Sequence, residues 1–318
     1  MLKSIAIMTS GGDSPGMNAA ARAVVRTALY EGVKVFGIYD GYKGMLEDRI
    51  VELNSQSVSD IIQRGGTFLG TARCPEFKQE ETRKEALKIL QSHGIEGLVI
   101  IGGDGSLRGA EEFERETGFS VIGIPATIEN DIWGTDYAIG TDTAVNTILQ
   151  AINEIRDTAK AHRRTFIIEV MGNKCATYSA VAGGGNMVIV PEEEFDKEKI
   201  INKVQKLHDG GKSYLVILAS EGTGNMQELV KELEARTGIS TRLTVLGLVQ
   251  RGGSPTANDR VFASVLGEQA TLAAVSGLHN IVFGMQRGNI VCIDLRDAIT
   301  NKKEYPEDLR HLAEVISL

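Results

Sequence analysis

Short apolar runs alternate with longer amphipathic stretches along the whole 318-residue chain. The runs expected to form strands are residues 4–9, 33–39, 98–101, 121–124, 165–170, 214–219, 244–249, 281–284 and 289–293. Strands that alternate with helices favour parallel pairing through right-handed crossovers, because each helix returns the chain over a face of the sheet. The pattern therefore predicts an α/β protein with mainly parallel sheets.

Three of the intervening stretches carry clear helix signals. Residues 15–31 open with Ser14 as the expected N-cap and Pro15 as the first helical residue. Residues 142–160 repeat apolar side chains at helical spacing, and residues 225–237 end before Gly238. Glycine-rich turns follow several of the strands, which favours loops that face ligands.

Two positions suit a domain boundary: one near Gly140, and one in the turn Gly252-Gly253-Ser254-Pro255, which can continue neither a helix nor a strand. We expect one domain of residues 1–140 and 252–302 and a second of residues 141–251 and 303–318. Two α/β domains with a site between them suit a reaction of two substrates, because each domain can hold one of them.

The composition excludes several classes of protein. Hydrophobic residues make up 42% and charged residues 24%, as in globular proteins, and the net charge of −8 argues against a nucleic-acid or membrane-surface binder. An anionic substrate would need local clusters of Arg and Lys. The three cysteines have no CxxC spacing and no apolar run reaches membrane-span length, so we expect a cytoplasmic protein with reduced thiols.

The segment Gly-Gly-Asp-Gly-Ser at 102–106 follows an apolar run and leads into an expected helix. A glycine-rich turn at the end of a buried strand lets backbone N–H groups approach a phosphate, and Asp104 inside it can hold the Mg²⁺ that accompanies a nucleotide. Thr9–Gly16 forms a similar turn after the first strand, but it matches neither the dinucleotide fingerprint nor the P-loop pattern. A tight connection that binds nothing is the alternative there.

Two carboxylates, Glu129 and Asp131, follow the next apolar run beside Thr127. On a loop they can converge on one alcohol, with Glu129 as general base and Asp131 placing the alcohol or the metal. The alternative is a polar turn around Asn130. Together with the 102–106 turn, this segment predicts a small-molecule kinase.

Several cations are candidates for binding phosphate. Arg73, in a loop bounded by Gly and Pro, can clamp a transferring phosphoryl group or be a solvated surface charge. Arg164, Arg242 and Arg251 each lie at the edge of an apolar run, but spacing cannot show that they meet. The five histidines lack metal-ligand spacing, so no zinc site is expected. The charged stretch 301–310 is most simply a solvated face.

At these residues the chain resembles the bacterial ATP-dependent 6-phosphofructokinases. The matching segments follow the family's order and span nearly the whole chain: Thr9–Met17, Gly65–Thr67, Thr71–Phe77, Gly102–Ser106, Thr127–Asp131, Glu169–Gly172 and Thr241–Pro255. The resemblance implies two Rossmann-like three-layer domains, a homotetramer, and phosphorylation of the 1-hydroxyl of fructose 6-phosphate by Mg-ATP.

The resemblance also implies site residues. ATP and Mg²⁺ would be bound by Gly11, Gly12, Arg73, Cys74, Gly103, Asp104, Gly105 and Ser106. The sugar phosphate would be bound by Thr127, Glu129, Arg164, Met171, Gly172, Glu221, Arg242 and Arg251, with Arg164 and Arg242 reaching across a subunit interface. An effector, ADP or phosphoenolpyruvate, would be bound by Arg22, Arg26, Arg156 and Lys212. Gly105, where diphosphate-using relatives tend to carry Asp, favours ATP as the donor.

This sequence departs from the family's pattern at the ligand sites. Glu129 stands where the family has the aspartate that acts as general base. Ala126 stands where the family has a glycine before the threonine, here Thr127. Asn173 stands where the family has an Arg, and the loop expected at 173–183 is about three residues shorter than the family's. Leu248 stands where the family has a His. In the effector site, Gly210 stands where the family has an Arg, and Asn186 stands where it has a Glu.

Three functions are compatible with these departures. The first is an active phosphofructokinase with altered kinetics and altered or weak allostery. The second is a family member that has lost most catalysis and serves as a regulatory or structural partner of a paralogue. The third is a kinase for another sugar phosphate or with another phosphoryl donor.

Overall fold

The computed structural model describes residues 2–317. This part of the chain folds into two compact units: unit 1 contains the residues up to Thr143 together with Arg251–Lys303, and unit 2 contains Ala144–Gln250 and the residues from Glu304 onward. The chain therefore passes between the units three times. Within the described residues, no helix has the length and apolar character that crossing a lipid bilayer requires.

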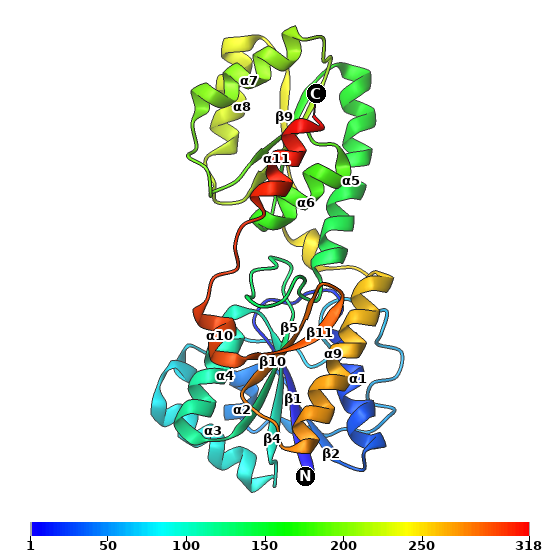
Figure 1. Ribbon diagram of the computed structural model, residues 1–318, viewed down its shortest axis with the longest axis vertical. Coiled ribbons are helices and arrows are strands. Elements are labelled where there is room, and N and C mark those ends of the chain that lie inside the picture. Colours follow the sequence, from blue (N-terminus) through cyan, green and yellow to red (C-terminus); the bar gives the residue numbers. More distant parts are fainter. Residues whose placement is uncertain (1, 318) are drawn as a thin grey trace. The chain divides into compact units, whose positions relative to one another are not determined.

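A seven-stranded sheet forms the centre of unit 1 (Figure 1), in the order β11-β10-β5-β4-β1-β2-β3. The five inner strands run parallel, while β3 and β11 pair antiparallel at the two edges. The strands are β1 (Ser4–Ser10), β2 (Lys34–Ile38), β3 (Ile50–Glu52), β4 (Gly97–Gly102), β5 (Ser120–Pro125), β10 (Ile281–Gln286) and β11 (Asn289–Asp294).

Helices cover both faces of this sheet because its strands are apolar on both sides. Ile5 and Ile7 of β1 share a core with α1 and α9, whereas Ala6 and Met8 face a second core with α3, α4 and α10. Helices α1 and α9 lie side by side. The helical segments of unit 1 are α1 (Met17–Tyr30), α2 (Gly41–Leu46), the 3₁₀ helix η1 (Pro75–Lys78), α3 (Glu80–Ser92), α4 (Asp104–Thr117), α9 (Ala257–Ser276) and α10 (Leu295–Thr300).

Unit 2 is built on a four-stranded parallel sheet in the order β7-β8-β6-β9. Helices α7 and α8 bury their apolar faces against one side of it, and α6 packs between β8 and α11. The elements are α5 (Thr141–His162), which begins in unit 1, β6 (Thr165–Val170), α6 (Asn173–Gly183), β7 (Met187–Ile189), α7 (Lys197–Asp209), β8 (Leu215–Ser220), α8 (Met226–Thr237), β9 (Thr241–Val245), the 3₁₀ helix η2 (Gly247–Arg251) and α11 (Glu307–Val315).

The α/β class and the mainly parallel pairing are confirmed. The strand expected at 244–249 is wrong: β9 ends at Val245, and Gly247, at φ 55°, leads into η2. Leu248 and Val249 are exposed, so this apolar run does not fill a core.

The helix expected from residue 15 begins at Met17, with Gly16 in a left-handed conformation before it. Ser14 does not cap it, because its hydroxyl donates instead to the carbonyl of Ile139 at 2.8 Å. The segment 173–183, expected as a loop, is helix α6.

Candidate active site

A cavity of about 930 Å³ opens in unit 1 at the carboxyl ends of three parallel strands. Ser10 of β1 pairs with Gly102 of β4, and Gly102 pairs with Pro125 of β5, so the loops after these strands leave the sheet at one level. Ligands of open α/β sheets bind at this edge. The cavity is lined by residues from segments 10–13, 71–78, 103–106 and 126–131, and by Tyr42 and Arg251.

The first two turns meet closely in this cavity. Gly11 has φ 82°, and a Cβ placed on it would lie 2.9 Å from Ser106 Oγ, so the conformation and the contact both require glycine. Ser106 Oγ is buried and has no hydrogen-bond partner among residues 2–317. A buried hydroxyl normally finds a partner, so this atom points to a ligand in the cavity.

Asp104 is the first residue of α4, where the positive end of the helix dipole favours negative charge. Its Oδ2 accepts a hydrogen bond from Arg108 Nε at 2.7 Å. That bond raises the pKa of Arg108, and the charge of Asp131 contributes to the same shift. Both candidate metal-binding carboxylates therefore act on one guanidinium, although they come from different loops.

A Mg²⁺ ion that arrives with a nucleotide is held by one or two carboxylates, by phosphates and by water. The half-exposed Asp104 at the cavity wall fits that requirement. Across residues 2–317 the structure contains no group of three or more His, Cys, Asp or Glu side chains able to hold a metal ion.

The wall formed by residues 71–78 is fastened to the two turns. Thr71 Oγ1 donates to the carbonyl of Gly11 at 2.7 Å, and the Tyr42 hydroxyl donates to the carbonyl of Ser106 at 2.7 Å. Burial raises the pKa of Tyr42, so the phenol stays protonated and keeps donating, and its ring stacks on Phe77 at 4.0 Å. Burial also raises the pKa of the Cys74 thiol, which makes it a poor nucleophile.

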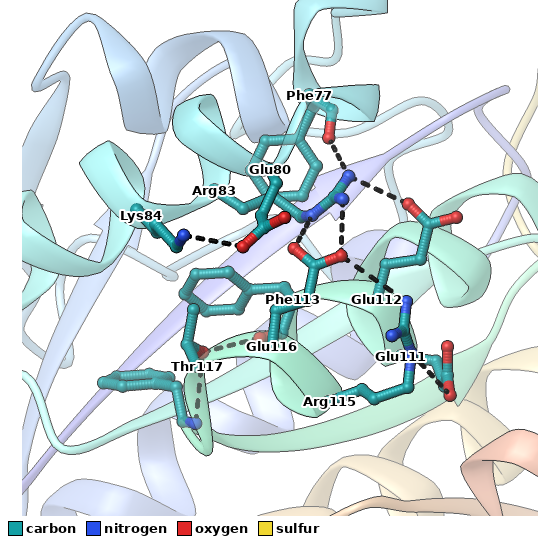
Figure 2. A network of polar contacts seen from close by, with 11 residues as sticks. Phe77, Glu80, Arg83, Lys84, Glu111, Glu112, Phe113, Arg115, Glu116 and Thr117 are labelled. Atoms are coloured by element: carbon teal, nitrogen blue, oxygen red, sulfur yellow. Dashed lines mark hydrogen bonds and ion pairs between the residues drawn. The ribbon is translucent and has the colours of Figure 1, made fainter.

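Behind this wall, the buried Arg83 of α3 joins three segments (Figure 2). Its guanidinium donates to Glu116 through two nitrogens at 2.6 and 2.7 Å, to Glu112 at 2.9 Å and to the carbonyl of Phe77 at 2.7 Å. The bond from Arg83 lowers the pKa of Glu116. Arg83 therefore ties η1, which lines the cavity, to the helix that begins at Asp104.

The third loop carries the candidate catalytic carboxylates. Thr127 donates its N–H to the carbonyl of Ile139 at 3.0 Å and accepts the N–H of Glu129 on its hydroxyl at 3.2 Å. Thr127, Glu129 and Asp131 all line the cavity. Asn130 between the carboxylates is fully buried, so the polar turn around it and the two cavity-facing carboxylates coexist in one loop.

Arg251 is brought from far along the sequence into the same cavity. A Cβ placed on Gly12 would lie 1.9 Å from Arg251 Nη1, so the guanidinium packs directly against that glycine. Arg251 Nε is buried without a hydrogen-bond partner among the described residues. Arg73 also lines the cavity, which gives it two arginines.

Met171, Gly172 and Glu221 lie together in unit 2, after the carboxyl ends of β6 and β8. Glu221 donates its N–H to the carbonyl of Val170 at 2.8 Å, and the buried Gln250 side chain bonds both the N–H and the carbonyl of Met171. Burial, followed by the charge of Glu221, raises the pKa of Glu169.

The two remaining arginines do not join this group within one chain. Arg164 precedes β6, and Arg242 lies at the start of β9, paired with Glu234 at 2.8 Å. Met171 follows the opposite end of β6, so the six residues of this strand lie between it and Arg164, which places the two roughly 20 Å apart.

The four predicted effector residues are divided between the units. Arg22 and Arg26 are one turn apart on α1, and burial followed by the charge of Arg26 lowers the pKa of Arg22. Arg156 and Lys212 line a second cavity, of about 390 Å³, in unit 2. Lys212 Nζ donates to the carbonyl of Ser317 at 2.6 Å.

Two departures from the family pattern have visible local roles. The Asn173 amide donates to the Glu192 carboxylate, and its carbonyl accepts the N–H of Lys174 at the start of α6. Asn186 accepts the N–H of Val216 at 2.9 Å, which fastens it to β8. Leu248 is 76% exposed.

Sequence reasoning missed several residues of the cavity, among them Tyr42, Lys78 and Arg108 beside it. Arg108 had a readable signal, since it lies four residues after Asp104, the helical spacing of an ion pair. Tyr42 had none, because only the folded unit brings α2, which carries it, next to α4.

Comparisons with known proteins agree on one family. The phosphofructokinase family model matches residues 4–274. A curated ATP-dependent 6-phosphofructokinase of Clostridium botulinum is 47% identical over 319 residues, covering 99% of this chain and 100% of that protein.

Among solved structures, the phosphofructokinase of Saccharomyces cerevisiae has a TM-score of 0.86 at 33% identity, and that of Pichia pastoris, in the T-state, has 0.89 at 34%. They match 99% and 100% of this chain, which spans only 46% and 37% of those longer chains. By sequence and by fold, this chain belongs to the phosphofructokinase family.

Proposed function

We propose that the protein transfers the terminal phosphoryl group of Mg-ATP to the 1-hydroxyl of fructose 6-phosphate, forming fructose 1,6-bisphosphate in glycolysis. The observation that carries the proposal is the unit 1 cavity, where a glycine-rich helix start, four carboxylates and two arginines converge. The full-length likeness to a curated ATP-dependent 6-phosphofructokinase supports the same substrates.

The nucleotide phosphates are expected to lie at the start of α4 and against Gly11, where backbone N–H groups and the helix dipole favour anions. The Ser106 hydroxyl, which has no hydrogen-bond partner among residues 2–317, is available to them. Asp104 would hold Mg²⁺, which when bound neutralises charge that develops on the phosphates. A Cβ on Gly105 would meet nothing within 4 Å, so glycine leaves open space here for a nucleotide.

At the acceptor, Glu129 would take the proton of the sugar 1-hydroxyl as general base, while Asp131 and Thr127 place that hydroxyl. Arg73 and Arg251 would balance the negative charge that spreads over the phosphoryl oxygens in transfer. The buried Nε of Arg251, which has no partner in the described part of the chain, supports this role, since an oxyanion would satisfy it.

The sugar phosphate is expected to bind to Met171, Gly172 and Glu221 in unit 2, which makes unit 1 the ATP domain and unit 2 the sugar domain. Because Arg164 and Met171 lie at opposite ends of β6, a ligand contacted by both needs two chains. This geometry supports an oligomer, for which we propose the family's homotetramer.

Regulation by ADP or phosphoenolpyruvate is part of the proposal, with Arg156 and Lys212 lining a cavity that suits an anion. Arg22 and Arg26 of α1 are proposed as further effector-binding residues.

The test is formation of fructose 1,6-bisphosphate by the purified chain from Mg-ATP and fructose 6-phosphate, with diphosphate and other sugar phosphates as parallel substrates. Turnover with ATP and fructose 6-phosphate supports the proposal. Turnover only with another donor or sugar would replace it. ATP binding without any turnover would favour a partner subunit.

A further inference from the structure

One side chain behind the cavity fixes the loop that carries both candidate catalytic carboxylates. Lys303, three residues after α10, donates from Nζ to Asn130 Oδ1 at 2.7 Å and to the carbonyl of Asp136 at 2.8 Å. We propose that Lys303 is a positioning residue for phosphoryl transfer: its ammonium holds the 127–138 loop in the shape that presents Glu129 and Asp131 to the cavity. The inference rests on the proposed function, which supplies the reaction.

The loop needs such a restraint because of the conformation of Asn130. This residue has φ 52°, in the left-handed region, which few residues with a Cβ adopt and for which Asn is better suited than most. The Asn130 side chain satisfies backbone groups of the loop that no helix or strand satisfies. Its Nδ2 donates to the carbonyl of Asp136 at 3.0 Å, and its Oδ1 accepts the N–H of Ala138 at 3.0 Å. Asn130 is fully buried, so these hydrogen bonds are shielded from water.

The far end of the loop is anchored to the sheet. The N–H of Asp136 donates to the carbonyl of Met285 in β10 at 2.7 Å, and Asp136 Oδ2 accepts the N–H of Arg287 at 2.6 Å. The hydrogen bond from Asn130 to the Asp136 carbonyl connects the middle of the loop to this anchored end. Lys303 donates to both Asn130 Oδ1 and the Asp136 carbonyl, and so holds these two parts of the loop together.

The charge of Lys303 matters as well as its reach. Hydrogen bonds from an ammonium group are stronger than those between neutral groups. Lys303 is also the last residue of unit 1 before the chain enters unit 2, so the restraint acts where the chain leaves the unit that contains the cavity. The charged stretch 301–310 is therefore more than a solvated face.

The test compares Lys303→Met with Lys302→Met, since Lys302 is the exposed neighbour in the same stretch. Three quantities are measured for each variant: kcat and KM for both substrates, the melting temperature, and hydrogen exchange of the amides in segment 127–138. A displaced reacting group of about 1 Å can lower the rate by about 100-fold. We expect Lys303→Met to lower kcat by about 10- to 100-fold, with KM for ATP changed less than about 3-fold, and to speed exchange in this segment.

Two further variants separate positioning from general stability. Lys303→Arg keeps a cation that can donate to both acceptors, so it should recover part of the lost kcat. Combined with Asn130→Ala, the lysine change should add little, because both changes break one link.

The inference is overturned if Lys303→Met has the kcat and exchange of Lys302→Met, or if its melting temperature and ATP affinity fall together with kcat. Failure of the proposed function looks different, because the unaltered chain would then be inactive. The exchange measurement still reports whether Lys303 holds the loop.

Discussion

Gly12→Ala tests the arrangement of the cavity through a single added methyl group. A Cβ on Gly12 would lie 1.9 Å from Arg251 Nη1, whereas ordinary contacts begin near 3.4 Å, so the nitrogen must move by about 1.5 Å. The neighbour is the end of a flexible side chain, and the fold can therefore absorb the change with a melting temperature close to the unaltered value.

Activity should respond strongly, because a misplacement of about 1 Å near the reacting atoms costs about 100-fold, or about 2.7 kcal/mol of barrier. We expect kcat/KM for fructose 6-phosphate to fall about 100-fold in Gly12→Ala. Gly252→Ala is the matched control, since a Cβ there meets nothing within 4 Å. The assay is coupled detection of fructose 1,6-bisphosphate over a range of both substrates.

Arg251→Ala and the double variant with Gly12→Ala complete a cycle. If the methyl acts by displacing the guanidinium, the double variant should be no slower than Arg251→Ala alone. A Gly12→Ala enzyme with unaltered kcat/KM would refute the role given to Arg251. A double variant far slower than Arg251→Ala would show that Gly12 acts by another route.

Three more outcomes follow from the structure. Glu129→Asp should raise turnover if the longer glutamate is a displaced base; an unchanged or lower rate would mean that the site has adapted to Glu129. Arg83→Met should lower the free energy of unfolding in urea by about 2 kcal/mol, because it removes the charge-assisted hydrogen bonds of the buried Arg83 to Glu116 and Glu112. The pKa of Glu116 is lowered in the fold by Arg83, so this pair stabilises the protein above the unfolded pKa near 4.5 and the contribution is lost as the pH falls below it. Unfolding measured from pH 7 to pH 3 should therefore be less pH-dependent in Arg83→Met; an equal acid slope would contradict the assignment. Asp104→Asn should raise the Mg²⁺ concentration for half-maximal activity at least 10-fold, and an unchanged Mg²⁺ titration would exclude Asp104 as the metal ligand.

Local sequence patterns predicted many of the residues that line the unit 1 cavity. Asp104 and Ser106 follow a buried strand and open a helix, and that local order by itself places them at a sheet edge. Glu129 and Asp131 follow the next strand, so parallel pairing of β4 and β5 brings the two turns together. The expected strand at 244–249 failed because an apolar run is also compatible with an exposed 3₁₀ turn.

The sequence by itself determined the α/β class, most strand positions and the two loops that begin at neighbouring strand ends, because these follow from residue periodicity and from glycine turns. The tertiary structure alone decided that Arg251 packs against Gly12, that Arg83 joins η1 to α4, and that Lys303 holds Asn130. It also placed Arg164 and Met171 at opposite ends of one strand. Contacts between residues so distant in sequence arise from how helices and loops pack on the sheet, and no local pattern records that packing.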